Sequence, residues 1–266
     1  MTALVSPGIR RIRVGATGHR YEINRQKAIG VTTALGLAIA KPGLMKWAAK
    51  CVATEAVGLL DLDEAQRRDW KNSRNIGSTD ELLWHLSAAA ERARNAAAVR
   101  GTKVHTFAEK LVHGEPVDVP EDLAPYVDNA ARFMDEWKIA PMLKETIVGS
   151  YQWGYAGTLD LVGALPDGRR VLWDYKTGKR VYPETKLQLA AYRHADAYLA
   201  SPGLEIPMAE VGITDSKVVW LREDGYDVIP LDSGQMEFKT FLHCLQVAKA
   251  VKAMEGWEGE PERRPW

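Results

Sequence analysis

The sequence predicts an α/β fold in which a mainly helical N-terminal region precedes a β-sheet with helices around it. The first observation is a helical spacing of apolar residues, as in Leu44, Trp47 and Cys51. The second is a set of three apolar segments between residues 145 and 175, separated by turn residues as strands are. The third is a helical segment followed by two more strands. Helices first and a meander afterwards indicate an α/β or α+β domain.

The N-terminal half begins with two strand patterns and continues with helical ones. Pro42 and Gly43 interrupt the first helical stretch. Ser78 or Thr79 is suited to cap a long helix, and a further helix begins near Gly101. The predicted elements are strands 11–14 and 19–23, followed by helices 32–60, a short one within 61–76, 79–99, 101–112 and 125–137.

The C-terminal half is predicted to consist of strands with a helix between them. Pro166-Asp167-Gly168 and Asp224-Gly225 are hairpin signals, and Pro183 is favoured at the start of a helix. The predicted elements are strands 145–153, 155–165 and 170–175, helix 184–199, strands 217–222 and 226–230, and helix 233–254.

Composition limits the class of protein. The 266 residues are 46% hydrophobic and 26% charged, as in ordinary soluble globular proteins. No apolar run approaches the roughly 18 residues that span a bilayer, and the first 13 residues lack the apolar region of a secretory signal. We therefore expect a cytoplasmic protein with no membrane partner. The formal net charge of 0 argues against a large DNA footprint, although a local basic channel is compatible with it.

Two clusters of cations are candidates for such a channel, and a solvated surface is the alternative interpretation of each. One lies near the start of the chain and the other follows the third predicted strand of the meander. Their members are Arg10, Arg11 and Arg13, and Lys176, Lys179, Arg180 and Lys186.

Two acids and a lysine lie within apolar strand segments. Asp174 and Lys176 are two residues apart, so they point to the same face of a strand. An exposed ion pair would explain these two alone. Asp160 lies in the preceding strand, and a turn at Asp167 would bring it close to Asp174. Because neighbouring carboxylates repel unless a proton or a cation lies between them, the pattern favours a divalent metal with oxygen ligands, Mg²⁺ or Mn²⁺.

Helical positions add further candidates. His105 lies four residues after Gly101, and Glu109 follows one turn later on the same face. Gln188 and Tyr192 have the same i, i+4 spacing. Instead of binding a metal, His105 could be a packed or surface residue. Gln188 and Tyr192 could simply pack against the sheet.

The order and spacing of these candidate residues resemble the pattern of a known protein family. The pattern is Gly101-x-x-x-His105, Glu145 on a strand, Gly157-Thr158-x-Asp160, Asp174-x-Lys176 and Gln188-x-x-x-Tyr192. It resembles the RecB-like branch of the PD-(D/E)xK nuclease superfamily, close to bacteriophage exonucleases related to CRISPR adaptation nucleases. The resemblance implies a restriction-endonuclease-like core, with a central mixed sheet flanked by helices. The expected division is a helical region at 1–98, the nuclease core at 99–256 and a loose tail at 257–266.

The resemblance also implies roles for individual residues. Asp160 and Asp174 would be metal-binding and catalytic acids, and Lys176 the active-site lysine. His105 would mark the RecB-like branch and favour Mn²⁺. The expected further ligands are the Tyr175 backbone carbonyl, Glu145 and Glu109, and the expected supporting or DNA-contacting residues are Gln188, Tyr192, Thr177, Lys179 and Arg180.

The expected function is a Mg²⁺- or Mn²⁺-dependent DNA exonuclease in phage or bacterial recombination, repair or replication. Its expected partners are single- or double-stranded DNA with a free end, and a recombination or single-strand-binding protein. A structure-specific endonuclease of the same fold and a non-catalytic DNA-binding recombination scaffold are the alternatives. Related adaptation nucleases hold an iron–sulfur cluster through four cysteines. This chain has only Cys51 and Cys244, so no such cluster is expected.

Overall fold

The computed structural model describes residues 8–15, 18–112 and 118–257. The chain separates into two compact units, a sheet unit formed by residues 1–39 and 105–266 and a helical unit formed by residues 40–104. This grouping differs from the division predicted after residue 98, because the first strands pair with the central sheet. The predicted tail at 257–266 lies outside the described residues except for Trp257.

The sheet unit is built on a ten-stranded mixed sheet within the described ranges. Its strands are β1 (Ile9–Val14), β2 (Gly18–Ile23), β3 (Gln26–Gly30), β4 (Ala140–Ser150), β5 (Tyr155–Ala164), β6 (Arg170–Lys176), β7 (Ala197–Ser201), β8 (Leu204–Pro207), β9 (Asp215–Leu221) and β10 (Tyr226–Pro230).

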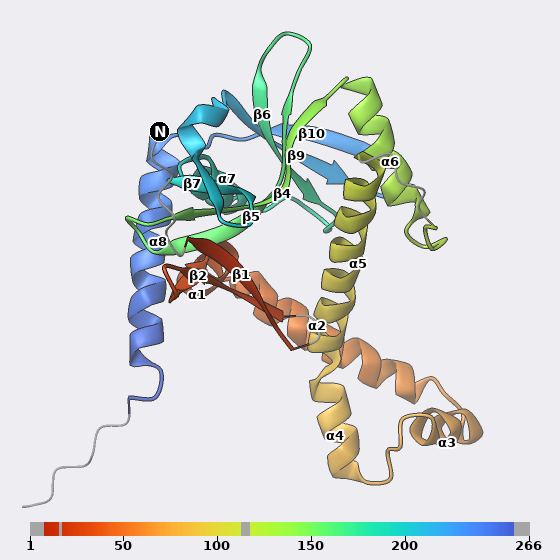
Figure 1. The fold of residues 1–266 in the computed structure, drawn as a ribbon. Helices are drawn as coiled ribbons and strands as arrows, with labels where there is room; N and C mark the ends of the chain where they lie inside the picture. The colour runs from red at the N-terminus through yellow and green to blue at the C-terminus, as the bar shows by residue number, and fades with distance from the viewer. Residues whose placement is uncertain (1–7, 16–17, 113–117, 258–266) are drawn as a thin grey trace, which may run out of the picture. The chain divides into compact units, whose positions relative to one another are not determined.

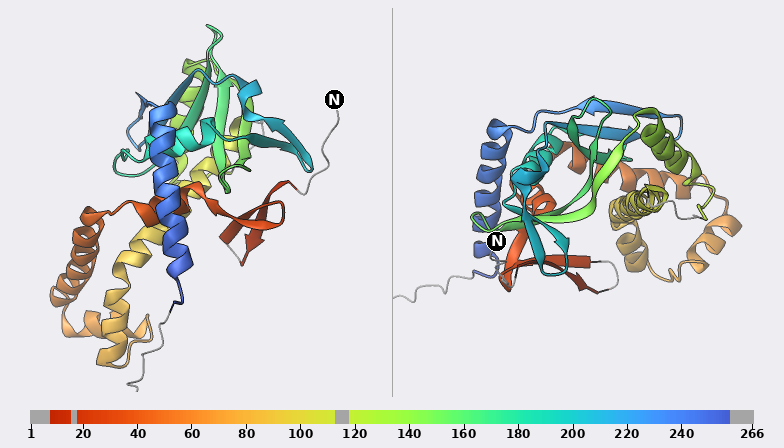
Figure 2. Two further views of the ribbon diagram at one scale, coloured as in Figure 1. Left: turned by 90° about the vertical axis from the view of Figure 1, so that its left-hand side faces the viewer. Right: turned by 45° about the horizontal axis from the view of Figure 1, so that its top comes forward.

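Strand β5 is the centre of this sheet. Strand β4 pairs with it antiparallel along one edge, and the antiparallel pair β7–β8 continues beyond β4. On the other edge, β3 pairs in parallel with the start of β5, and β6 pairs antiparallel with its end. Strand β9 is parallel to β6, and β10 is antiparallel to β9. Figure 2 shows that the sheet is curled. Strand β5 pairs with β3 and β4, which precede it in the chain, and with β6, which follows it.

The predicted hairpin at Asp167-Gly168 is present between β5 and β6. Gly168 has a φ of +86°, in the left-handed region that glycine adopts without a steric penalty. Its amide donates to the Leu165 carbonyl over 2.9 Å. In the resulting register Leu161 lies opposite Trp173, which places Asp160 beside Asp174.

Helices cover the sheet from several sides. Helices α8 and α6 stand at opposite margins of the strands in Figures 1 and 2. The core on one face joins Leu35, Leu189 and Phe241 of three helices to Tyr155 and Leu159 of β5. The helices of this unit are α1 (Val31–Ala38), α6 (Ala124–Glu136), α7 (Thr185–Arg193) and α8 (Gln235–Met254), with the short 3₁₀ helix η1 (Met208–Val211). Helix α5 (Ala89–Val112) belongs to both units, and its sheet-unit part begins at His105.

The helical unit contains α2 (Pro42–Leu60), α3 (Glu64–Asn72) and α4 (Thr79–Ser87), together with the first part of α5. Capping boxes at Asp63 and Ser78 begin α3 and α4, because each side chain accepts from an otherwise unpaired amide of the first turn. Glu55 pairs with His85 at 3.0 Å and Arg92 at 2.5 Å, which ties α2 to the two later helices.

Four predicted helices are wrong in extent. The helix expected over 32–60 is two helices, since Pro42 begins a new one. The predicted break near residue 100 lies instead at Ala88, and α5 continues through Gly101. The helix expected over 184–199 ends at Arg193, because Ala197 pairs with Gly149 as the start of β7.

Within the described ranges, no helix has both the length and the apolar character needed to cross a membrane. Cys51 lies in α2 and Cys244 in α8, and both are half-buried free thiols.

Candidate metal and active site

Three neighbouring strands place the acids at one point of the sheet. Asp160 accepts a hydrogen bond from the Tyr175 amide over 2.8 Å, which fixes its carboxylate against β6. In β4, Lys144 lies opposite Leu161 and Thr146 opposite Leu159, so Glu145 stands opposite Asp160. Glu145 has a φ of +41°, a left-handed conformation that costs energy in a residue with a Cβ. Such strain is found at functional sites more often than elsewhere.

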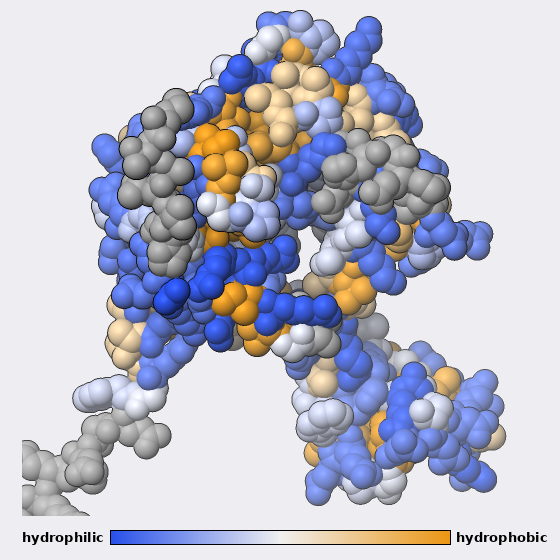
Figure 3. All heavy atoms as spheres, viewed as in Figure 1, coloured by the Kyte–Doolittle hydropathy of each residue, from blue (hydrophilic) through white to orange (hydrophobic). Residues whose placement is uncertain are grey.

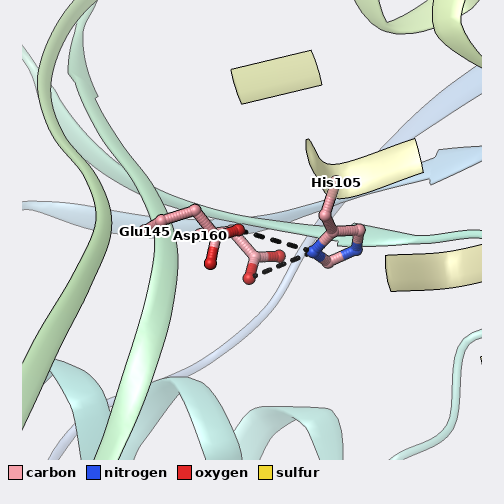
Figure 4. Close-up of side chains that lie close together, drawn as sticks. All are labelled: His105, Glu145 and Asp160. Carbon is pink, nitrogen blue, oxygen red and sulfur yellow. Dashed lines mark ion pairs between the residues drawn. The ribbon is translucent and has the colours of Figure 1, made fainter. Parts of the chain in front are cut away.

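Helix α5 brings His105 to these carboxylates. Its Nδ1 lies 3.5 Å from Asp160 Oδ1 and 3.8 Å from Glu145 Oε1, and Figure 4 shows the imidazole directed at both. Its Nε2 lies 3.1 Å from the Tyr175 carbonyl oxygen. Among the described residues, His105, Glu145 and Asp160 form the group whose ligand atoms all lie within 4.8 Å of one another. These three residues are the metal triad.

Charges within the metal triad stabilise one another. Burial alone would lower the pKa of His105, but Asp160 and Glu145 outweigh it and hold the pKa well above its usual value. Burial would raise the pKa of Asp160, yet His105, Lys176 and the Tyr175 amide keep it below its usual value. These shifts favour the protonated form of His105 between two carboxylates, at a position that suits a cation.

Asp174 and Lys176 form a second cluster beside the metal triad. Lys176 Nζ lies 2.6 Å from Asp174 Oδ2, and the side chain of Asp174 is 2% exposed. Burial raises the pKa of Asp174 to about 6, although Lys176 opposes the shift. Burial would lower the pKa of Lys176, but Asp174 and Asp160 raise it above its ordinary value. The lysine is therefore held as a cation.

Helix α7 supplies the outer part of this cluster. Gln188 donates to Asp174 Oδ1 over 3.0 Å, and Lys176 donates to the amide oxygen of Gln188 over 3.4 Å. Tyr192 places its hydroxyl 3.3 Å from the Gln188 amide nitrogen. The i, i+4 pair predicted from the sequence therefore orients both the acid and the lysine.

A glycine allows α7 to approach this closely. A Cβ on Gly157 would lie 2.5 Å from Tyr192 Cε1, inside van der Waals contact. On the opposite face of β5, Thr158 shares a 2.8 Å hydrogen bond with the Tyr21 hydroxyl. Sequence reasoning missed Tyr21 as a neighbour of the site. The alternation of Tyr21 with Ile23 indicates a strand with one buried face. It does not indicate which other strand that face contacts.

The remaining predicted residues lie further out or cannot be placed. Lys179 and Arg180 are exposed in the loop after β6, and Arg180 lies over the Tyr182 ring at 4.6 Å. Thr177 is half-buried at the start of the same loop. Glu109 belongs to α5, but its side chain lies outside the described part of the structure.

The donor set fits a divalent cation. Two carboxylates and an imidazole are ligands that Mn²⁺ accepts, whereas Mg²⁺ prefers oxygen alone. Asp174 is not one of the metal triad, but its buried Oδ2 has no hydrogen bond of acceptable geometry despite the adjacent ammonium. That oxygen is therefore available as a further ligand if Lys176 moves.

Comparison with models of known protein families and with curated proteins found no match. Any functional conclusion therefore depends on the side chains of the site and on the sequence pattern that contains them.

Proposed function

We propose that this protein is a Mg²⁺- or Mn²⁺-dependent DNA exonuclease of phage or bacterial DNA metabolism. The observation that supports the proposal most is the convergence of His105, Glu145 and Asp160 beside the Asp174–Lys176 pair. These residues come from four separate elements, and their types and order match the RecB-like nuclease pattern. A structural ion-pair network would not require this combination of a histidine, three carboxylates and one lysine.

The metal triad would hold the cation, with Asp174 as an additional donor. The Tyr175 carbonyl, which the resemblance implies as a ligand, lies at His105 Nε2 instead and would orient the imidazole. A bound Mg²⁺ or Mn²⁺ would polarise the scissile phosphate and lower the pKa of a water. The protein's own contribution is to hold these donors in place through the Tyr175 amide and the α5 backbone. The imidazolium proton of His105 must leave before its Nδ1 can act as a donor.

Lys176 acts as a cation in this proposal. Because neighbouring carboxylates raise its pKa, the ammonium keeps its proton and stabilises the negative charge that develops on the phosphate. Gln188 limits the movement of the ammonium by accepting from it while donating to Asp174. This arrangement favours electrostatic stabilisation over proton abstraction by the lysine.

Nucleotide release from end-labelled linear DNA in Mn²⁺ tests the proposal. Wild type should degrade the DNA, and Asp174→Asn or Lys176→Gln should reduce the rate by about 10²–10³, the usual effect of removing one transition-state partner. Lys239→Gln, an exposed lysine of α8, is the matched control and should retain full activity. Equal rates for wild type, Asp174→Asn and Lys176→Gln would contradict the proposal.

A further inference from the structure

The first three strands carry an excess of positive charge. Residues 9–30 contain one acid, Glu22, and six cations: Arg10, Arg11, Arg13, Arg20, Arg25 and Lys27. Figure 3 shows mainly hydrophilic side chains over β1 and β2 on the viewed face, with a small hydrophobic patch among them. This charge contrasts with the neutral balance of the whole chain.

Strand register separates these cations into two faces. Arg10 lies opposite Glu22, and Ile12 lies opposite Arg20, so these residues share one face of the β1–β2 pair. Both arginines there contact Glu22, at 3.0 Å and 3.1 Å. Lys27 of β3 lies opposite Glu22 in the strand register. The only acid of the segment therefore neutralises this face in part.

The other face continues from the protein core. Ile9 lies opposite Ile23, and both are buried against Ala156 of β5. Tyr21 follows on this face and bonds to Thr158, two residues before Asp160 on the same side of β5. Burial raises the pKa of the Tyr21 hydroxyl, and the Glu145 carboxylate raises it further while Arg11 opposes the shift. This face of the hairpin therefore leads directly to the metal triad.

Beyond Tyr21, the described residues of β1 and β2 on this face are basic. Arg11 lies opposite Tyr21, and Arg13 lies opposite His19. All three polar side chains are exposed, and Arg11 Nη2 lies 3.4 Å from His19 Nδ1. Burial and Arg11 together lower the pKa of His19, as expected where positive groups gather. Phosphate groups are the ligands that such a cluster favours.

We propose that the Arg11–Arg13–His19 face of the β1–β2 hairpin is a phosphate-binding arm for the nucleic acid. The arm holds the sugar–phosphate backbone next to the cleaved bond, while Tyr21 anchors it to β5. It reads no base sequence, since arginine contacts to phosphates position a strand without specifying it. This inference rests on the proposed function, but it concerns binding and can be tested without cleavage.

The test measures binding of fluorescein-labelled DNA by anisotropy, in EDTA and over a range of salt concentrations. Each phosphate contact contributes about 0.7–0.9 to the slope of log K against log salt. Arg11→Gln with Arg13→Gln should therefore lower the slope by about 1.4–1.8, and should weaken binding roughly 25- to 60-fold at 0.1 M salt. Arg11→Lys with Arg13→Lys should keep the wild-type slope.

Arg10→Gln with Arg20→Gln is the matched control, because it removes the same charge from the opposite face of the same strands. Its slope should stay within about 0.5 of wild type. Equal losses of affinity in both glutamine double variants, or no loss of affinity in the Arg11 and Arg13 variant, would overturn the proposed phosphate-binding arm. Thermal unfolding of each variant checks that the protein remains folded.

The two proposals fail differently. If wild type cleaves DNA in Mn²⁺ but the Arg11 and Arg13 double variant binds normally, only the arm is wrong. If wild type binds through these arginines but does not cleave, the arm stands and the nuclease assignment is wrong.

Discussion

Gly157→Ala is the most specific test of how α7 is held against the site. The added methyl group would lie 2.5 Å from Tyr192 Cε1. Tyr192 is 3% exposed, so its ring has no solvent to move into. Because Tyr192 also contacts Gln188, displacement of the ring would disturb the partner that orients Asp174 and Lys176.

The expected loss of stability follows from how far the Tyr192 ring must move. Ordinary van der Waals contact begins near 3.4 Å, so the ring must move by 0.9 Å, the difference between 3.4 and 2.5 Å. Overpacking of this kind typically costs about 1–3 kcal/mol. For a chain of this size, about 2 kcal/mol corresponds to a decrease of roughly 4–8 °C in the melting temperature.

Thermal unfolding followed by circular dichroism measures this effect. Gly36→Ala is the matched control, because a Cβ at that exposed position of α1 meets nothing within 4 Å. Replacing glycine by alanine inside a helix should stabilise the protein by about 0.5–1 kcal/mol. The double variant Tyr192→Leu with Gly157→Ala should lose less stability than the sum of the losses in the two single variants. Additive effects, or a Gly157→Ala variant as stable as wild type, would refute the described contact.

Three further changes test other parts of the structure. Phe133→Ala should cost about 3–5 kcal/mol in urea unfolding, because this fully buried ring contacts Trp173 and Tyr175 behind the site; a loss below about 1 kcal/mol would contradict the aromatic packing. Ser78→Ala should cost about 1 kcal/mol through loss of the α4 capping box, whereas Ser87→Ala, at the other end of the helix, should cost less. In EDTA, the raised pKa of His105 stabilises the protein fully below pH 6.5, and this contribution disappears as the pH rises through the folded-state pKa. His105→Gln should therefore flatten the decrease in stability above pH 6.5, and an unchanged decrease would show that His105 is not held as an imidazolium.

The β5–β6 hairpin could be predicted because its determinants are local. Pro166-Asp167-Gly168 gives the turn, and the turn gives the register that brings Asp160 beside Asp174. Lys176 follows from strand alternation, since residues two apart share a face. The positions of Gln188 and Tyr192 follow in the same way from helical spacing.

Tertiary pairings were less accessible to sequence reasoning. The sequence places residues 197–199, the start of β7, at the end of a helix, because their pairing with β4 involves residues about 50 positions earlier in the chain. The parallel pairing of β3 with β5 joins segments more than 120 residues apart, and no local signal encodes it. The resemblance makes Glu145 a candidate ligand, but only the β4–β5 register shows that it faces Asp160.

Paired digestion of linear and covalently closed circular DNA of one sequence, in Mn²⁺, tests the proposed function most directly. We predict that wild type degrades the linear form completely and leaves the circle intact, while Asp174→Asn degrades neither. Cleavage of the circle at a comparable rate would contradict the exonuclease assignment in favour of an endonuclease. Failure of wild type to degrade either form, despite Mn²⁺ and DNA binding, would contradict catalysis altogether.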